Sequence, residues 1–493
     1  MYVPFVSCAL GVLRQGGLHS FILPDALARE KYALPLRRFL VDHTTLAHWM
    51  HFEGVNVFDE VSRHCVIYVL HNERPVKESQ VVIDSSLRTT AITGPLYKIA
   101  QSDCLVGPAQ QFRSEGAAGV AADLLKRIEN QSVRLGQYCY VMIGATTHSK
   151  DRASFHKADI LTSFPKGNAK PFFDGKNLGR YEIVRDGRYL DYRRDEMYGP
   201  RVPELFESPK IVVRNVTDEN ERLIVAFDND GLFCDDLVNC ITPYENVQGT
   251  GAQTNFEGYP RLSMHIPSLQ YTLAIVASSL MSWYFRSVFA TGTLQGSYSH
   301  TYPQQVRAFP IRRIAFTAPE KERARFLDKE RKLYERCLAE GDHARVLEFI
   351  EQALKQALEH ADVVHDLLAF LAEEMIEMNK AKQVEVRGFL SWLERESGAK
   401  VEDLKNKTKL KGYHDGTFEV LLEVLKENRR ALSVEPSERK FQDRLAKEYT
   451  DSLAKLGPLK IRVEATDRLI DQIVYRLYGL TEEEIKIVKA GVK

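Results

Sequence analysis

The residues from Gly16 to Leu70 alternate between apolar, strand-like runs and a helical stretch. The strand-like runs cover residues 18–24, 46–52 and 65–70, and the helical stretch separates the first two. Strands that alternate with a helix are typical of a parallel sheet. Such a sheet is buried on both faces and needs more strands than these three. We therefore expect the late part of a larger sheet, completed by a partner chain or by the front of a longer enzyme.

Length and composition narrow the class of protein only broadly. The 493 residues suffice for about three domains. Lys+Arg and Asp+Glu both number 67, so the net charge does not indicate a polyanionic partner, although a local basic face could still bind nucleic acid. Seven cysteines without a Cys-x-x-Cys pair predict reduced thiols and no zinc site. No apolar run reaches about 18 residues, which predicts a soluble, cytoplasmic protein without a membrane partner.

The texture of the chain changes three times along its length. We expect part of a sheet domain at 1–75, a connector at 76–131, an α+β region at 132–316 and a helical region at 317–493. Within the third part, residues 269–289 predict one helix. In the fourth part, apolar residues from Ile350 to Met378 repeat in steps of four and three, which predicts one long helix. Its apolar seam serves either packing in a helical hairpin or a dimerisation coil.

The usual catalytic motifs are missing from the sequence. It contains no His-Glu-x-x-His, no Gly-x-Ser-x-Gly and no glycine-rich phosphate loop of either common type. No aspartate and glutamate pattern indicates a nuclease. The residues alone therefore predict no catalytic, cofactor-binding or metal-binding residue in this chain.

Two segments at the front of the chain resemble a known enzyme family. Residues 16–24 with 28–40, and residues 55–70, resemble the late strands and helix of amino-group DNA methyltransferases. The match is to the adenine-specific enzymes of type II and fused type IIG restriction–modification systems. In that family an aromatic residue stacks on the flipped adenine, and Phe58 occupies the matching position. The alternative is that Phe58 only caps the core of the sheet.

The region that follows resembles the TaqI-like target-recognition domain of such enzymes. Five segments match in order, at residues 172–181, 208–214, 223–227, 272–285 and 309–312. Recognition of DNA needs Arg, Lys, Asn or Gln at base edges and cations at phosphates. The candidate DNA-binding residues are Lys176, Asn177, Arg180, Arg214, Gln295, Ser297 and Tyr298. Two alternatives stay open: Lys176 and Asn177 could only shape their turn, and Arg214 could form a structural ion pair, with Lys210 at the start of the same strand.

The departure from the family decides what function we expect. Its members bind S-adenosylmethionine through a glycine-rich loop and hold the adenine amine with an Asn/Asp-Pro-Pro-Tyr/Phe tetrapeptide, and neither occurs here. The resemblance thus implies the late part of a Rossmann-like α/β methyltransferase sheet, an α+β DNA-recognition domain and an all-α C-terminal region. It also implies S-adenosylmethionine in the complete enzyme but not on this chain alone.

We therefore expect a DNA adenine methyltransferase of a restriction–modification system, of which this chain carries the recognition part. Its expected partners are double-stranded DNA and a separate chain that supplies the N-terminal catalytic half. One alternative is a non-catalytic DNA-specificity subunit that acts with a separate methyltransferase chain. The other is a helical adaptor without DNA binding, which rests on the helical tail and the zero net charge.

Overall fold

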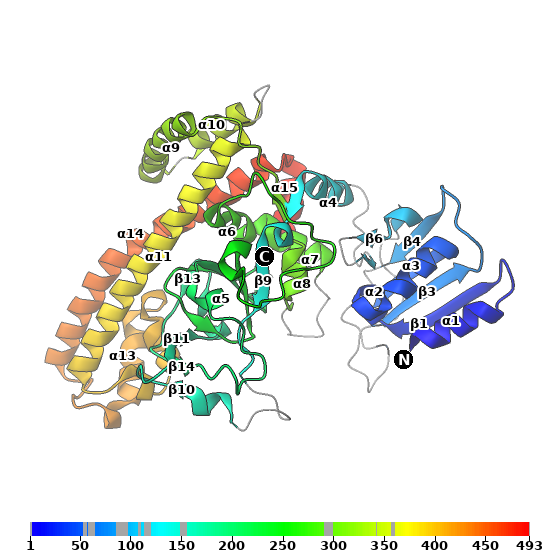
Figure 1. The fold of residues 1–493 in the computed structure, drawn as a ribbon. Helices are drawn as coiled ribbons and strands as arrows, with labels where there is room; N and C mark the ends of the chain where they lie inside the picture. Colours follow the sequence, from blue (N-terminus) through cyan, green and yellow to red (C-terminus); the bar gives the residue numbers. More distant parts are fainter. Residues whose placement is uncertain are drawn as a thin grey trace. The chain divides into compact units, whose positions relative to one another are not determined.

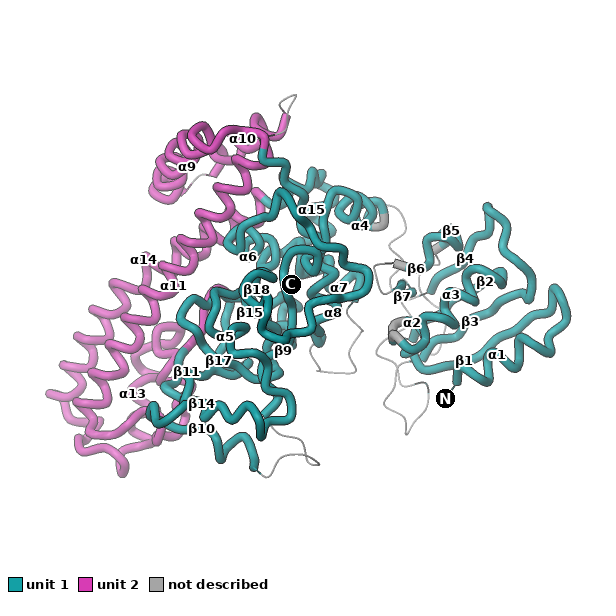
Figure 2. The backbone as a smooth tube through the Cα atoms, viewed as in Figure 1, with its two compact units in different colours: residues 1–180, 185–316, 474–493 teal, residues 181–184, 317–473 magenta. Residues whose placement is uncertain are grey.

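The computed structural model describes residues 2–52, 57, 65–84, 97–106, 110–112, 120–147, 155–289, 299–341, 343–355 and 360–492. The chain is mixed α/β, with several small sheets and a helical C-terminal region (Figure 1). It divides into two compact units, the first with residues 1–180, 185–316 and 474–493, the second with residues 181–184 and 317–473 (Figure 2). No helix in the described ranges combines the length and apolar character that crossing a membrane requires.

A five-stranded sheet forms the N-terminal part of the first unit. Its strand order is β1-β3-β2-β4-β5, with β1 at Leu18–Pro24, β2 at Thr45–Phe52, β3 at Cys65–His71, β4 at Gln80–Asp84 and β5 at Tyr97–Ala100. Both β1 and β2 pair antiparallel with β3, and β4 pairs antiparallel with β5. Only the β2–β4 pair is parallel.

The expectation of a parallel sheet is therefore wrong for most neighbouring strands. The helices α2 (Ala26–Arg29) and α3 (Leu34–His43) return the chain so that β1 and β2 run in the same direction. The next strand, β3, then enters between them in the opposite direction. The alternation of strands and helix in the sequence predicts that a helical stretch connects β1 to β2. It does not predict that β3, which comes later in the chain, lies between them. These described strands do not by themselves establish a Rossmann-like sheet.

The same sheet continues beyond residue 75 into the segment that we expected to be a connector. Its strands β4 and β5 both come from that segment. Gln101, which follows β5, donates to the carbonyls of Val41 and Thr44 at 2.8 and 2.6 Å and accepts from the N–H of Leu46 at 3.0 Å. This buried amide therefore binds the end of α3 and the start of β2 together.

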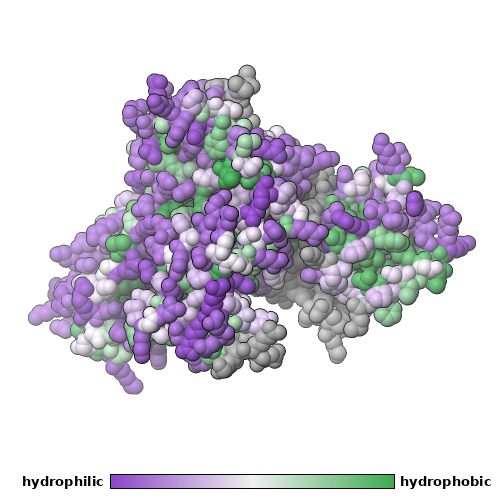
Figure 3. Space-filling view, viewed as in Figure 1, coloured by the Kyte–Doolittle hydropathy of each residue, from purple (hydrophilic) through white to green (hydrophobic). Residues whose placement is uncertain are grey.

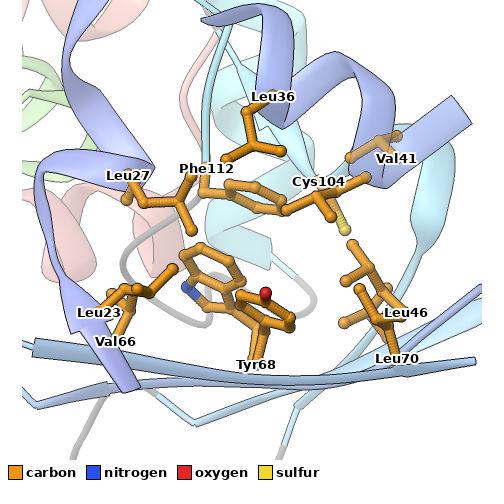
Figure 4. Close-up of a cluster of buried hydrophobic side chains, with 14 of the residues drawn as sticks. Leu23, Leu27, Leu36, Val41, Leu46, Val66, Tyr68, Leu70, Cys104 and Phe112 are labelled. Atoms are coloured by element: carbon orange, nitrogen blue, oxygen red, sulfur yellow. The ribbon is translucent and has the colours of Figure 1, made fainter. Parts of the chain in front are cut away.

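Apolar side chains from the sheet and from α2 and α3 meet in one core (Figure 4). Trp49 stacks on Phe112, with the ring centroids 3.9 Å apart. The guanidinium of Arg37 is buried within this core and donates to the carbonyls of Leu27, Glu30 and Gln110 at 2.8–3.0 Å. Burial lowers its pKa to about 10, and the carbonyls supply the acceptors that a buried cation needs. Nearby lie α1 (Tyr2–Val12), β6 (Leu105–Val106) and β7 (Gln111–Phe112).

Two further four-stranded sheets lie in the rest of the first unit. One has the order β16-β15-β18-β9 and is antiparallel throughout, and the other has the order β10-β14-β11-β17. The first contains β9 (Cys139–Ile143), β15 (Lys210–Arg214), β16 (Val225–Asp228) and β18 (Val238–Pro243). The second contains β10 (Leu161–Thr162), β11 (Ala169–Phe173), β14 (Tyr189–Asp191) and β17 (Phe233–Cys234). The first unit also contains β12 (Leu178–Gly179) and α5 (Glu204–Glu207), whereas β13 (Glu182–Ile183) belongs to the second unit.

The single helix predicted at 269–289 is in fact two helices, α6 (Leu269–Ala277) and α7 (Ser279–Val288). The break falls at Ser278, whose backbone is extended (φ −67°, ψ 155°). Its hydroxyl donates to the carbonyl of Ile275 at 2.7 Å and accepts from the N–H of Met281 at 3.2 Å. Serine competes for backbone groups in this way and favours helix starts, so it ends one helix and begins the next.

The last residues of the chain pack on the first unit. The hydroxyl of Tyr478 donates to the carbonyl of Pro310 at 2.9 Å and accepts from the N–H of Arg312 at 2.8 Å. Gly479 ends the preceding helix with a left-handed backbone (φ +65°), a role that suits glycine. Thr481 and Glu484 form a capping box at the start of α15 (Glu482–Gly491). Neighbouring elements are α4 (Val120–Asn130), β8 (Ser132–Arg134), α8 (Pro303–Arg307) and β19 (Pro310–Arg312).

The second unit is a helical bundle, and its predicted long helix is also interrupted. The apolar seam from Ile350 to Met378 spans two helices, because α10 ends at Leu354 and α11 begins at Ala361. Seam residues Val364, Leu368 and Leu371 are fully buried within the chain itself, which supports packing within a helical bundle. The helices are α9 (Glu320–Glu340), α10 (Ala344–Leu354), α11 (Ala361–Ser397), α12 (Lys407–Lys411), α13 (Phe418–Glu427) and α14 (Arg439–Leu477).

A buried carboxyl in this bundle predicts a pH-dependent stability. Glu330 on α9 is 0% exposed, and neither of its carboxyl oxygens has a hydrogen-bond partner among the described residues. Burial, with a smaller contribution from Asp366, raises its pKa to about 9 from the ordinary 4.5. Between these two values the folded protein keeps a proton that the unfolded chain has lost. Rising pH therefore costs stability at about 1.4 kcal/mol per pH unit for this group.

Replacement of this residue, Glu330→Gln, should remove that slope. We expect the difference in free energy of unfolding between the variant and the unchanged chain to grow in favour of the variant from pH 5.5 to pH 8, as measured by denaturant titration. The exposed Glu340→Gln on the same helix is the control and should show no such trend. Parallel pH profiles for Glu330→Gln and the unchanged chain would contradict the assignment.

Candidate DNA-recognition surface

The turn at residues 174–177 is built around the side chain of Asn177. A short 3₁₀ helix at Gly175–Asn177 joins β11 to β12. The Oδ1 atom of Asn177 accepts from the N–H of Asp174 at 3.1 Å and from Arg188 at 2.9 Å, and its Nδ2 donates to Asp186 at 3.2 Å. Asn177 is 9% exposed. These contacts match one of the two roles predicted for Asn177, the shaping of the turn.

Arg188 joins the acidic residues around this turn. Its guanidinium lies 3.0 Å from Asp174 and 2.6 Å from Asp186, and it stands over the ring of Phe172 at 5.5 Å. Burial alone would raise the pKa of Asp186, but the hydrogen bond and charge of Arg188 outweigh it, and the net shift is downward. Charge-assisted bonds of this kind are among the stronger hydrogen bonds in proteins. The bonds of Arg188 hold the backbone of the turn in place, and Lys176 extends from this backbone.

Lys176 and Arg214 lie on one cavity of about 520 Å³. Lys176 is the more exposed of the two, with 71% of its side chain accessible and its Nζ 3.4 Å from Asp174. Arg214 is half-buried and donates to the carbonyls of Val216 and Thr217, both at 3.0 Å. The cavity is lined by Gly175, Lys176, Arg214, Asn215, Val216, Asp218, Glu219, Asn220, Ile224 and Leu237.

The strand β15 forms an ion pair at Lys210, at the opposite end of the strand from Arg214. Lys210 is fully buried and pairs with Asp228 on the neighbouring strand β16. Asp228 also accepts from the N–H groups of Asp230 and Leu232, both at 2.9 Å. Because buried charges need partners, Lys210 and Asp228 stabilise the sheet. Arg214, at the other end of the strand, donates to backbone carbonyls.

The remaining predicted residues are placed as follows. Arg180 donates to the carbonyl of Ala277 at the end of α6. Phe58, Gln295, Ser297 and Tyr298 lie outside the described residues. The next described residues, Ser299 and His300, contact the cavity wall. The N–H of Thr217 donates to the carbonyl of Ser299 at 3.1 Å, and Val216 forms an isolated β-bridge with His300.

The sequence reasoning missed the polar turn between β15 and β16. Asn215, Asp218, Glu219 and Asn220 all line the cavity, and Asp218 accepts from the N–H groups of Asn220 and Arg222 at 2.9 and 2.7 Å. Side-chain amides suit the edges of bases. The signal was present as a run of Asn and Asp between two strands, a composition that is equally typical of any turn.

The fold and the site define an α+β region whose small sheets present a polar, open cavity. A helical region follows it in the chain. Residues 170–311 match the family described as the TaqI-like C-terminal specificity domain, which confirms the resemblance found in the sequence. This part of the chain therefore resembles a TaqI-like specificity domain. Residues 363–474 match a family described as a domain of unknown function, DUF8810. No curated protein matches the sequence.

Several solved structures resemble the chain weakly. The type IIL restriction–modification enzyme MmeI in complex with DNA has 9% identity and a TM-score of 0.37, over 89% of this chain and 50% of that one. A DrdV–DNA complex has 11% identity and a TM-score of 0.33, over 95% and 52%. The type IIG restriction endonuclease BpuSI has 13% identity and a TM-score of 0.26, over 64% and 42%. The chain spans about half the length of these enzymes.

The neighbours Lys176 and Asn177 should respond differently to substitution. Asn177→Ala removes the acceptor and donor that join Asp174, Asp186 and Arg188, so we expect a loss of about 2–3 kcal/mol in the free energy of unfolding. Lys176→Ala should change stability by less than about 0.5 kcal/mol, because an exposed ion pair contributes little. Denaturant titration of both variants measures the difference. A stable Asn177→Ala protein would contradict the structural role.

Proposed function

We propose that this chain recognises a specific sequence in double-stranded DNA, as the specificity part of a restriction–modification DNA methyltransferase. The match of residues 170–311 to the TaqI-like specificity family carries the proposal. The cavity beside Lys176 supports it, because an exposed cation and the amides of Asn215 and Asn220 lie close together there. Phosphate contacts position a protein on DNA, and contacts to base edges give specificity.

The complete enzyme, on this proposal, methylates adenine with S-adenosylmethionine. The N-terminal sheet of this chain does not fit that cofactor. The strand β1 ends at Pro24, and Asp25 follows it without a glycine-rich loop. Trp49, Tyr68 and Phe112 fill the covered face of the sheet. Methyl transfer would therefore depend on residues supplied by another segment or by a separate chain, with which this chain would act as a specificity subunit.

The outer edge of the N-terminal sheet offers a place for such a segment. The strand β1 is at the edge of the sheet and, among the described strands, pairs only with β3. Hydrophobic residues gather over α1 and β1 (Figure 3), where Phe5, Val12, Leu18 and Ile22 are between 39% and 88% exposed. An exposed, apolar edge strand is a template for an added strand.

Binding of duplex DNA over a range of salt concentrations tests the recognition proposal. We expect the purified chain to bind a duplex, with the logarithm of affinity falling linearly with the logarithm of salt concentration. Lys176→Gln should weaken binding several-fold and lower the steepness of that line by about 1. Lys77→Gln, an exposed lysine near the N-terminal sheet, is the matched control. Failure of the unchanged chain to bind any duplex at low salt would sink the proposal.

The cofactor part of the proposal is tested separately by calorimetry. We expect no heat of binding when S-adenosylmethionine is titrated into the chain alone, because the N-terminal sheet does not fit the cofactor. S-adenosylhomocysteine should behave in the same way. Micromolar or tighter binding of either compound would place the cofactor site within this chain.

A further inference from the structure

Two arginines of the specificity domain stand over aromatic rings, and a third binds the strand that carries one further ring. We call Arg201, Arg261, Arg307 and the rings of Tyr140, Tyr244 and Phe256 the arginine–aromatic cluster. The guanidinium carbon of Arg307 lies 3.8 Å from the ring centroid of Phe256, and that of Arg261 lies 3.0 Å from the centroid of Tyr244. The Tyr140 centroid lies 6.2 Å from that of Tyr244 and 6.0 Å from that of Phe256.

Hydrogen bonds hold the members of this cluster in place. Tyr244 donates its hydroxyl to the carbonyl of Gly136 at 2.8 Å. Arg201 donates to the carbonyl of Ile143 at the end of β9 at 3.1 Å, and Arg261 donates to the carbonyl of Thr254 at 3.2 Å. Gly136 packs so closely that a Cβ atom there would lie 2.9 Å from the Cβ of Arg307. The position of Arg307 is therefore set by the fold.

The positive charges of the cluster have no acidic partner in the part of the chain that the structure describes. Within the described ranges, none of Arg201, Arg261 and Arg307 forms an ion pair, whereas Arg188 and Arg193 of the same domain each pair with carboxylates. The guanidinium of Arg307 also makes no hydrogen bond there, and its buried Nε has no partner.

The aromatic members do not supply the missing negative charge. Burial raises the pKa of Tyr244 to about 12, with Arg261 and Arg307 opposing the shift, so its hydroxyl stays protonated at physiological pH. Burial raises the pKa of Tyr140 as well, against the charges of Arg201 and Arg307. Glu204, Glu245 and Glu257 are the acidic residues nearest in sequence to Arg201, Tyr244 and Phe256, and all three are exposed and make no described ion pair.

We propose that the arginine–aromatic cluster binds the backbone phosphates of duplex DNA. This inference rests on the proposed recognition of DNA and assigns residues that the sequence reasoning did not select. A guanidinium stacked flat on a ring keeps its N–H edge available for two parallel bonds to a phosphate. The stacking also holds the side chain in place before the ligand arrives, which lowers the entropic cost of binding.

The cavity beside Lys176 has a different charge pattern, which separates the two sites. There Asp218 and Glu219 accompany Lys176 and Arg214, so the local charge is balanced, and the asparagine amides suit base edges. The cluster has three cations and no paired acid, which suits phosphates of any sequence. The cluster would thus position the domain on DNA, while the cavity would read bases.

Substitution of Arg307 tests this inference in the full chain. Fluorescence anisotropy with a labelled duplex should show Arg307→Gln binding about tenfold more weakly at 100 mM salt, to the same extent for duplexes of different sequence, and with a salt slope lower by about 1. Arg307→Lys keeps the charge and should retain most of the salt slope. Arg193→Gln, whose charge is already paired with Asp191 and Glu196, should bind within twofold of the unchanged chain.

Each outcome of this experiment bears on a distinct claim. Equal duplex affinity of Arg307→Gln and the unchanged chain, with DNA bound in both cases, overturns the inference but not the proposed function. Absence of duplex binding by the unchanged chain overturns both. Because Arg307 packs against Gly136, the melting temperature of each variant is measured. Arg261→Gln changes the exposed member of the cluster, and it should also weaken duplex binding without a loss of packing.

Discussion

The bonds of Arg188 with Asp174, Asp186 and Asn177 are the constraint on which the recognition surface depends. A planar guanidinium with five donors can bind two carboxylates and an amide oxygen at once. Without it, Asp186 would lose the ion pair with Arg188, and Asp174 would keep, of its described ion pairs, only those with Lys157 at 3.9 Å and Lys176 at 3.4 Å. Because Arg188 closes this turn, it holds the backbone from Asp174 to Asn177 in place, and Lys176 lies at the neighbouring cavity with its Nζ 3.4 Å from Asp174.

The distribution of charge within the specificity domain is more informative than the net charge of the chain. Lys210 and Arg188 pair with acids inside the protein, and their charges therefore serve the fold. Arg261 and Arg307 stack on rings and have no acidic partner among the described residues. A whole-chain balance of zero averages these two kinds of cation and hides the difference between them. The third expected function, a helical adaptor without DNA binding, rested partly on that average.

Much of the fold could be predicted where local patterns decide it. The strand β1 was predicted with the bounds that the structure gives it, because it is a short apolar run bounded by turn residues. The break at Ser278 was not predicted, because one serine in an apolar run is compatible with an uninterrupted helix until its hydroxyl is seen to cap the next one. The split of the apolar seam between α10 and α11 was also not predicted, because the apolar spacing alone is compatible with one uninterrupted helix.

The candidate site was predictable as a region and not as a set of contacts. The order of five short segments identified the domain, since a family resemblance is carried by sequence alone. Whether Asn177 faces DNA or the protein interior, and whether Arg307 has an acidic neighbour, depends on residues 9 to 171 positions away that only the folded chain brings close. The sequence by itself therefore determined the local elements and the kind of domain. The tertiary structure alone decided which charged and polar side chains are satisfied internally and which are left for a ligand, because pairing of charges depends on distance in space.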